Sequence, residues 1–269
     1  MDVSIIIINY KTFLLTQQCI ESILHHTKDV SFEIVLVENG TDEFNKENTV
    51  QWGDKVKLIE SKDNLGFAGG NNLGIKYAKG KYILLLNSDT YLTEDSVSKS
   101  FHFMQEHPRV GVLTARLIYP DGRHQSVAQR FPSIKYSLIE LLRIQKFLSR
   151  RKAGKMLLGS FFEHNETTEA DWIWGAFFMM KSEIVTKLPE GKLDDSYFMY
   201  WEDVQWCMDI KKLGYQVFFF ADTTVVHIQE GSSGKKNDMM EKNKVVFFKK
   251  NYSYFETRII KILNKCLGV

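Results

Sequence analysis

The chain has 269 residues, 44% of them hydrophobic, which is enough for one large domain with a full core. Its 35 Lys and Arg nearly balance 33 Asp and Glu, so a net charge of +2 gives no reason to expect nucleic acid binding. The three cysteines are widely spaced, and neither a signal peptide pattern nor an apolar run near the ~18 residues that span a bilayer is visible. These features predict a cytoplasmic protein with reduced thiols.

The first half of the chain predicts strands that alternate with helices. Strands are expected where β-branched and apolar residues run together, and helices where apolar residues recur on one face. The expected strands are 3–8, 32–37, 55–59, 81–86 and 110–118, and the expected helices are 16–26, 66–79 and 93–106, the last capped by Thr93. This alternation predicts an α/β fold with a single, mostly parallel sheet flanked by helices.

The second half, residues 119–235, has a more mixed pattern. A helix is expected over 137–148, a strand over 172–180 with a break at Gly175, a helix over 204–213 closed by Gly214, and strands over 216–220 and 224–228. The Gly-Ser stretch 231–234 fits either a mobile lid or a simple flexible loop. A basic, aromatic tail that is expected to be helical follows over 236–269.

Polar residues stand where four of the expected strands end. They are Asn9 and Tyr10, Glu38 and Asn39, Asp63 and Asn64, and Asn87 and Asp89. Ligands of parallel α/β sheets sit beyond the carboxyl ends of the strands, so these side chains are expected to face one crevice. Asp89 offers the carboxylate oxygen that a hard divalent cation prefers beside phosphate oxygens, although it could also cap a turn.

Two further stretches carry candidate chemistry. Residues 64–74 are rich in Gly and Asn, which suits either a ligand held close to a helix N-terminus or a tight turn with Asn caps. The aromatic run 197–201 leads into Glu202 and Asp203 at the start of a helix. The helix dipole would lower the pKa of such an acidic pair, whereas burial under the aromatic rings would raise it and favour a general base. His227, at the end of a strand, is by itself more typical of a core residue.

Taken together, these residues resemble family 2 glycosyltransferases of the GT-A fold, especially the bacterial branch that resembles rhamnosyltransferases. The family's ordered motifs are a strand end like D-N-x-S, then N-x-G-F-A-G-G-N-N-x-G, N-P-D, D-W-x-x-G-A, F-D-E-x-F-F-M-Y-x-E-D-x-D-L and a late His. Here they correspond to residues 38–41, 64–74, 87–89, 171–176, 193–206 and His227, and the resemblance covers residues 1–235. It implies a nucleotide-sugar half over 1–118 and an acceptor and catalytic half over 119–235.

The resemblance also implies roles for individual residues. Asp203 would be the general base with Glu202 beside it, and Asp89 would hold Mg²⁺ or Mn²⁺ with His227. The donor site would include Asn9, Tyr10, Glu38, Asn39, Asn64, Gly66, Gly69, Gly70, Asn71 and Asn87. The donor sugar or the acceptor would lie against Asp171, Trp172, Gly175 and Trp201.

The sequence departs from the family pattern at several positions. Glu38 replaces Asp and lengthens the nucleoside contact, Ser88 replaces Pro in the metal turn, and Leu193 replaces Phe. Gln205 and Trp206 replace Asp-Leu after the base, which bears on substrate specificity more than on catalysis.

The implied reaction is inverting transfer of a sugar from a dTDP- or UDP-linked donor, with dTDP-L-rhamnose as the first candidate. The implied acceptor is a hydroxyl of a lipid-linked or growing surface polysaccharide. A UDP-hexose or N-acetylhexosamine transferase, a nucleotidyltransferase and a non-catalytic nucleotide-sugar-binding scaffold are the alternatives. A nucleotidyltransferase would want a Gly-rich, basic loop after the first strand, and residues 9–12 lack it.

Two segments, 134–155 and 239–267, are basic and amphipathic. Such helices can lie on anionic lipid, and lipid-linked acceptors would be found there. We therefore expect peripheral contact with the inner face of the cell membrane, the alternative being that both segments pack on the sheet with a solvated basic face.

Overall fold

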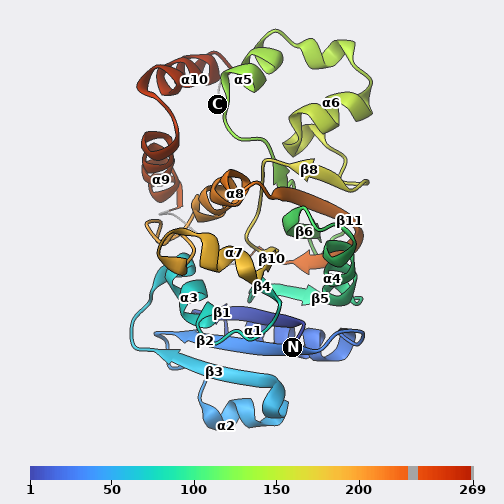
Figure 1. Cartoon of the computed structure of the whole chain (residues 1–269), viewed down its shortest axis with the longest axis vertical. Helices are drawn as coiled ribbons and strands as arrows, with labels where there is room; N and C mark the ends of the chain where they lie inside the picture. Colours follow the sequence, from blue (N-terminus) through green and yellow to red (C-terminus); the bar gives the residue numbers. More distant parts are fainter. Residues whose placement is uncertain (230–235, 268–269) are drawn as a thin grey trace.

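The computed structural model describes residues 1–229 and 236–267, and within them a nine-stranded mixed sheet forms the centre of the molecule (Figure 1). The strand order is β3-β2-β1-β4-β10-β6-β11-β5, with β8 paired to β11. The strands are β1 (Val3–Asn9), β2 (Phe32–Asn39), β3 (Val56–Ser61), β4 (Tyr82–Asn87), β5 (Thr90–Leu92), β6 (Val110–Ile118), β8 (Thr168–Ala170), β10 (Phe177–Lys181) and β11 (Gln216–His227). A separate pair is formed by β7 (Ala128–Gln129) and β9 (Trp172–Ile173).

Helices flank this sheet. They are α1 (Phe13–His26), α2 (Lys46–Thr49), α3 (Gly66–Ile75), α4 (Ser96–Glu106), α5 (Ile134–Leu141), α6 (Arg150–Leu157), α7 (Ser182–Lys187), α8 (Glu202–Lys212), α9 (Lys236–Asn251) and α10 (Tyr254–Leu267). Short 3₁₀ turns are η1 (Val50–Lys55), η2 (Ile144–Phe147), η3 (Gly159–Phe161) and η4 (Pro189–Gly191). In the part of the chain that the structure describes, no helix has both the length and the apolar character needed to cross a bilayer.

The register of the central strands brings the predicted strand-end residues to one edge. β1 pairs in parallel with β2 and with β4, so that Asn9 lies opposite Glu38 and Ile8 lies opposite Asn87. These three strands are almost wholly buried, as their continuous runs of β-branched and apolar residues predict. The polar ends of β1, β2 and β4 therefore meet at the same end of the sheet.

The predicted α/β fold is confirmed, but the sheet is mixed rather than mostly parallel. β10 is antiparallel to both β4 and β6 and lies between them, and β5 and β8 are both antiparallel to β11. The break predicted at Gly175 is also present, because β9 and β10 belong to different sheets. The two strands expected over 216–228 are a single strand, β11, whose register with β6 shifts between Phe220 and Thr224.

Some predicted helix boundaries are wrong. Thr93 is not the N-cap of α4: Asp95 takes that place, and its carboxylate accepts a hydrogen bond from the Ser98 backbone N–H at 3.0 Å. The helix expected to run to residue 79 ends at Ile75. The helix expected over 137–148 is α5 followed by η2, with Arg143 in the left-handed region between them. The predicted lid, 231–234, lies outside the described residues.

Candidate active site

Asn9 and Glu38 form a buried polar pair at the ends of β1 and β2. The Asn9 side-chain amide donates to Glu38 Oε2 at 2.8 Å, and its oxygen accepts from the Thr16 hydroxyl at 2.8 Å. The Glu38 carboxylate also accepts from the backbone N–H groups of Thr41 and Phe44. The longer Glu side chain therefore orders the loop after β2, while Tyr10 stands exposed beside it.

The Asn-rich entry to α3 is held by its own side chains. Asn39 donates to Asn64 Oδ1 at 3.0 Å and accepts from the Leu65 N–H at 3.0 Å, and Asn64 Oδ1 also accepts from the Gly66 N–H at 2.9 Å. The Phe67 N–H donates to the Phe198 carbonyl at 2.9 Å. The N–H groups of Gly66 and Phe67 in the first turn of α3 thus donate to protein groups.

Glycines in α3 have packing reasons. Gly66 has φ +73°, and a Cβ there would overlap the Phe198 carbonyl oxygen. A Cβ on Gly70 would come within 3.0 Å of Ile8 in β1, and one on Gly69 within 3.0 Å of Leu65. Gly66 and Gly70 let α3 lie close to the segment before α8 and to β1. The sequence predicts a different role for these glycines, namely contact with a ligand.

Asn71 and Asn72 are buried within the same helix. Asn71 donates to the Phe67 carbonyl at 3.0 Å. Asn72 exchanges two hydrogen bonds with the backbone of Leu193, at 2.8 and 3.0 Å. The double asparagine of the motif therefore holds α3 together internally and joins it to the chain that leads into the aromatic segment. The donor contacts predicted for Gly70 and Asn71 stay predictions.

Asp89 and His227 meet beyond the end of β4, as the family resemblance implied. Both side chains are buried, and His227 Nε2 lies 3.4 Å from Asp89 Oδ1. His227 Nδ1 donates to Gln125 Oε1 at 2.7 Å, which leaves Nε2 directed toward Asp89. Asn87 lies 3.5 Å from the same Nε2 through its amide nitrogen, and its buried Oδ1 has no partner.

This donor set fits a divalent cation. A ligating imidazole usually has its other nitrogen fixed by a hydrogen bond, as Gln125 fixes His227, and a carboxylate beside it supplies charge. The described residues contain no group of three or more His, Cys, Asp or Glu side chains that could hold a metal ion. A cation held by Asp89 and His227 would therefore need further oxygen ligands from a bound molecule or from water.

A strained turn precedes the acidic pair Glu202 and Asp203. Tyr200 and Trp201 both have positive φ, 71° and 74°, immediately before α8 begins at Glu202. Two consecutive non-glycine residues in this region cost about 1–2 kcal/mol each. The surrounding contacts must offset that cost, and the turn points Asp203 at the Gly175 backbone.

Burial decides the acid–base character of this pair. Asp203 accepts from the Gly175 N–H at 3.2 Å and from the Val204 N–H at 2.8 Å. Burial raises the pKa of Asp203 from 3.8 to about 6, although these backbone donors oppose the rise. The pKa of Glu202 is also raised, first by burial and then by the charge of Asp203, and its Oε2 has no partner. Asp203 is therefore ionised at neutral pH yet more basic than an ordinary carboxylate.

Gly175 is small for a reason. A Cβ at this position would come within 3.1 Å of the Phe67 ring, and its N–H is the donor to Asp203. Asp171, four residues earlier, is bound to protein groups: its carboxylate accepts from the Phe131 N–H at 3.1 Å and lies 3.5 Å from Arg130. The Trp172 indole donates to the Arg130 carbonyl at 3.1 Å.

The C-terminal tail supports the turn, which sequence reasoning missed. The Asn243 side chain in α9 donates to the carbonyls of Met199 and Tyr200 at 2.8 and 3.0 Å. The Trp201 ring lies 5.1 Å from that of Phe247, which is fully buried. The sequence signal for this contact is the Phe247-Phe248 pair within the basic, aromatic tail. α9 thus packs against the turn that leads into the acidic pair.

A family model described as glycosyl transferase family 2 matches residues 4–180, about two thirds of the chain. The chain belongs to this family. The match ends before Glu202, Asp203 and His227, so the case for these three residues rests on the geometry described above.

Relatives of this family 2 chain include enzymes of glycan assembly. A low-salt glycan biosynthesis hexosyltransferase of Haloferax volcanii is 25% identical over 212 residues, which cover 77% of this chain and 60% of the relative. The minor teichoic acid biosynthesis protein GgaB of Bacillus subtilis is 25% identical over 152 residues, covering 54% of this chain and 16% of the relative. The chain thus spans less than two thirds of the length of either relative.

Solved structures share the GT-A fold of this family 2 chain. A structure of GalNAc-T7 with UDP, GalNAc and Mn²⁺ matches 92% of this chain and 48% of its own, with a TM-score of 0.65 and 14% identity. Residues 1–349 of TarS from S. aureus match 99% of this chain and 71% of their own, with a TM-score of 0.58 and 17% identity.

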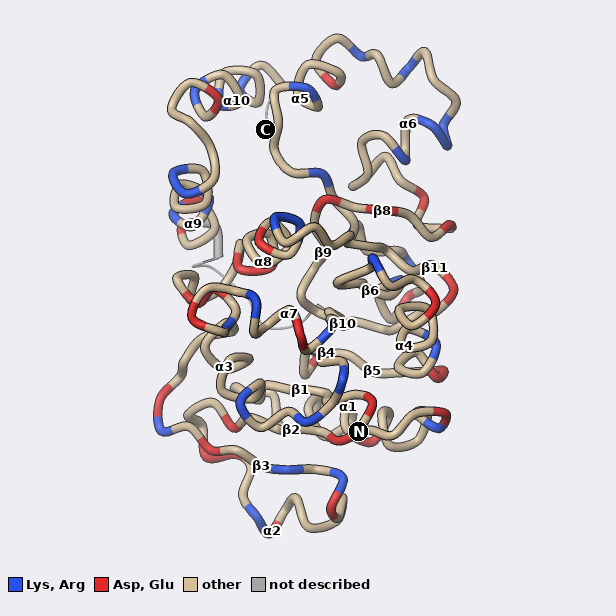
Figure 2. Tube along the Cα trace, viewed as in Figure 1, with Lys and Arg blue, Asp and Glu red and all other residues tan. Residues whose placement is uncertain are grey.

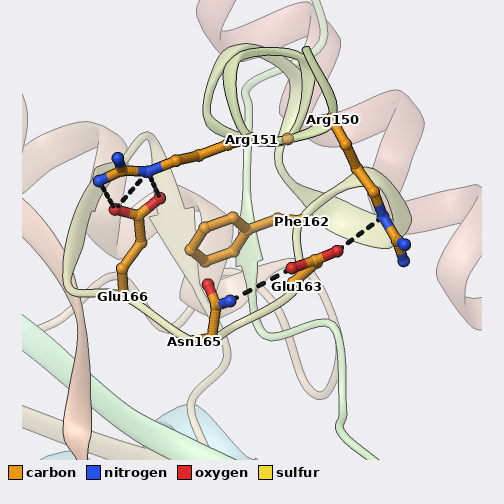
Figure 3. A pocket seen from close by; sticks show the side chains of 7 residues that line it. Arg150, Arg151, Phe162, Glu163, Asn165 and Glu166 are labelled. Atoms are coloured by element: carbon orange, nitrogen blue, oxygen red, sulfur yellow. Dashed lines mark hydrogen bonds and ion pairs between the residues drawn. The ribbon is translucent and has the colours of Figure 1, made fainter.

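A cavity of about 290 Å³ lies between α6 and the segment that precedes β8 (Figure 3). None of the residues that line it is a predicted site residue. Figure 3 shows Arg151 paired with Glu166 and Arg150 paired with Glu163 at its two sides, at 2.6 Å in each case. The two guanidinium groups and their two carboxylate partners therefore balance in charge along this cavity.

Proposed function

We propose that this protein is a metal-dependent, inverting glycosyltransferase that moves a sugar from a nucleotide-diphosphate donor to an acceptor hydroxyl. The observation that carries this proposal is Asp203. Its carboxylate is half-buried, is held by the Gly175 N–H, and has its pKa raised to about 6. In a family 2 GT-A fold such a group is suited to accept a proton from an attacking hydroxyl.

Asp203 would act as the general base of a single displacement. The acceptor oxygen attacks the anomeric carbon while Asp203 takes its proton, and the bond to the nucleoside diphosphate breaks on the opposite face. One such displacement inverts the anomeric centre through an oxocarbenium-like state. Glu202, buried beside it with a raised pKa, would stay protonated over a wider pH range and limit the charge in the pocket.

Asp89 and His227 would hold Mg²⁺ or Mn²⁺. The cation would neutralise the charge of the departing diphosphate, which makes a separate acid unnecessary. The orientation of His227 by Gln125 supports this assignment, as does the Mn²⁺ named for the GalNAc-T7 structure of the same fold.

The donor pocket would lie at the ends of β1, β2 and β4, within a donor half over 1–118. We propose dTDP-L-rhamnose as the first donor to test. A UDP-linked hexose or N-acetylhexosamine is the second, because the relative from Haloferax volcanii is named a hexosyltransferase and the GalNAc-T7 structure is named with UDP and GalNAc. The buried Asn9–Glu38 pair would fix the floor of this pocket, with the exposed Tyr10 at its rim.

The acceptor would be a lipid-linked or growing surface polysaccharide, bound by residues of the half 119–235. The names of the relatives, which refer to glycan and teichoic acid biosynthesis, support a glycan acceptor. An enzyme with such a substrate would work in the cytoplasm at the inner face of the cell membrane, and residues 236–269 would be its membrane-proximal tail.

A transfer assay tests this proposal. Purified protein is incubated with Mn²⁺, each of a panel of dTDP-, UDP- and GDP-sugars, and a simple glycoside acceptor, and nucleoside diphosphate release is followed. NMR of the product then gives its anomeric configuration. We expect an inverted product with one donor class and no product from Asp203→Asn, while the exposed Asp222→Asn serves as the matched control. Donor binding with no turnover under any condition would favour the scaffold alternative.

A further inference from the structure

Charge is distributed unevenly along this nearly neutral chain. Segments 134–155 and 239–267 together carry 14 Lys and Arg against 3 Asp and Glu, and the rest of the chain carries 21 against 30. α5, α6 and α10 gather at one end of the molecule, α9 lies beside α8, and β3 and α2 form the opposite end (Figures 1 and 2). We call the end formed by α5, η2 and α10, residues 134–147 and 254–267, the basic end. It carries six Lys and Arg against two Asp and Glu.

One face of α10 is apolar and has no partner. Phe255, Ile259 and Ile262 follow the i, i+4, i+7 spacing that places them on one stripe, and their exposed fractions are 77%, 41% and 56%. The packed face is a different one: Ile260 is buried, and Asn264 bonds to Ser137 of α5 at 3.1 Å. The helix therefore keeps three large apolar side chains in water after it has docked on the protein.

Basic residues flank this stripe on α10. Arg258, Lys261 and Lys265 recur with the i, i+3, i+7 spacing of a neighbouring stripe, and all three are exposed. An exposed apolar stripe beside a stripe of Lys and Arg is the pattern of helices that lie in the plane of a bilayer interface.

The neighbouring α5–η2 segment continues the same character. Leu142 follows α5 and is exposed, and Phe147 in η2 has an exposed fraction of 88%, the highest of the large apolar side chains in the described residues. Lys146 stands next to it. Because α5 contacts α10 through Ser137 and Asn264, the two elements present apolar and basic groups at one end of the molecule.

We propose that the basic end docks on an anionic lipid bilayer, with Phe255, Ile259, Ile262 and Phe147 entering the headgroup boundary and the basic side chains contacting lipid phosphates. The positive charge of the basic end favours an anionic bilayer over other binding partners. A second copy of the chain would bring two strongly basic surfaces together, whereas anionic headgroups complement them. A nucleic acid would satisfy the charges and leave the apolar stripe in water.

This inference deepens the membrane location of the proposed function, and it also connects that location to the active site. α9 precedes α10 in the chain, and its Asn243 and Phe247 hold the turn before Glu202 and Asp203. If α10 docks on the bilayer, only α9 would lie between α10 and the turn that precedes Glu202 and Asp203.

Vesicle flotation tests the proposal without donor or acceptor, so that its failure would leave the transferase proposal standing. The full-length protein is mixed with vesicles of phosphatidylcholine alone or with 30% phosphatidylglycerol, at low and high salt. We expect binding to the anionic vesicles that weakens as salt is raised. The triple variant R258Q/K261Q/K265Q should partition roughly 100-fold less, at about fivefold for each basic residue removed.

A second triple variant, F255S/I259S/I262S, tests the apolar stripe and should also lose most of its binding, including the part that resists salt. L14S and V50S remove equally exposed apolar side chains elsewhere on the molecule and should bind like the wild type. Thermal midpoints near that of the wild type verify folding of each variant. Equal binding to neutral and anionic vesicles, binding unaffected by both triple variants, or a dimer in light scattering that these variants dissolve would overturn the proposal.

Discussion

Replacing Asp203 with Asn should abolish turnover and, at neutral pH, make the protein more stable. The half-buried carboxyl has a folded-state pKa of about 6 against an ordinary 3.8. Below pH 3.8 the group is neutral in both states and contributes nothing to the pH dependence of stability. As pH rises from 3.8 through 6, the unfolded chain ionises more readily than the folded one, so the folded state loses stability progressively until the loss is complete above pH 6.

The size of this effect follows from the pKa difference. About two pKa units correspond to about 3 kcal/mol, which is the largest destabilisation that the ionised Asp203 can impose. Asn removes the charge but can accept only through one oxygen, so one of the bonds from Gly175 and Val204 is lost, at about 1 kcal/mol. The net gain should therefore be about 1–2 kcal/mol at pH 7.5, or roughly 2–8 °C in Tm.

Thermal unfolding across pH 4 to 8 and kcat/KM over the same range test both parts. For the wild type, kcat/KM should rise with an apparent pKa near 6, and the Asn variant should lose about 10²–10⁴-fold in rate. The stability advantage of the variant should disappear toward pH 4 and turn into a deficit of less than about 1 kcal/mol, because the ionisation penalty is lost there while the missing hydrogen bond remains. Turnover that survives the substitution would refute the assignment of Asp203 as the base. A variant that is destabilised by the same amount at pH 7.5 and at pH 4 would refute its raised pKa.

Three further predictions follow from the packing and the metal pair. Gly66→Ala should destabilise the fold by more than about 3 kcal/mol in chemical denaturation, because strain at φ +73° adds to overlap with a backbone carbonyl. Gly122→Ala, with φ +86° and open space around it, should cost only about 1 kcal/mol; equal costs would count against the contact. Asn243→Ala should lower kcat roughly tenfold while the donor KM stays within about twofold, and an unchanged kcat would argue that the turn holds itself. Chelation should stop turnover, and Asp89→Asn or His227→Ala should raise the Mn²⁺ concentration for half-maximal rate by at least about tenfold; turnover in EDTA would exclude this role.

Much of the fold follows from local sequence pattern. β1 and β2 are buried runs, and their predicted bounds lie within two residues of the observed ones because short runs of β-branched residues favour buried strands. β10 could not be placed in the same way. Its apolar run predicts a buried strand but not its direction or its neighbours, which depend on how the chain returns between β4 and β6.

The site was predictable where chemistry is local and unpredictable where contacts are distant. The opposing effects on Asp203 were visible in the aromatic run before it, but burial could be shown to win only with the fold in hand. The meeting of Asp89 with His227 rested on the resemblance alone, since 137 residues separate them. The contact of Gly70 with Ile8 in β1 and the hydrogen bonds of Asn243 to the turn before α8 could not be predicted from sequence. Both join segments that are far apart in the chain.

The most direct test of a metal-dependent nucleotide-sugar site is a thermal-shift panel of UDP-, dTDP- and GDP-sugars, each with and without Mn²⁺. A ligand that binds only the folded state adds about 2.7 kcal/mol of stability at a hundred times its Kd. We expect one nucleotide class to raise the Tm, only when Mn²⁺ is present, and to lose the effect in His227→Ala. The absence of a shift with every donor, or shifts that ignore both the metal and His227, would contradict the account.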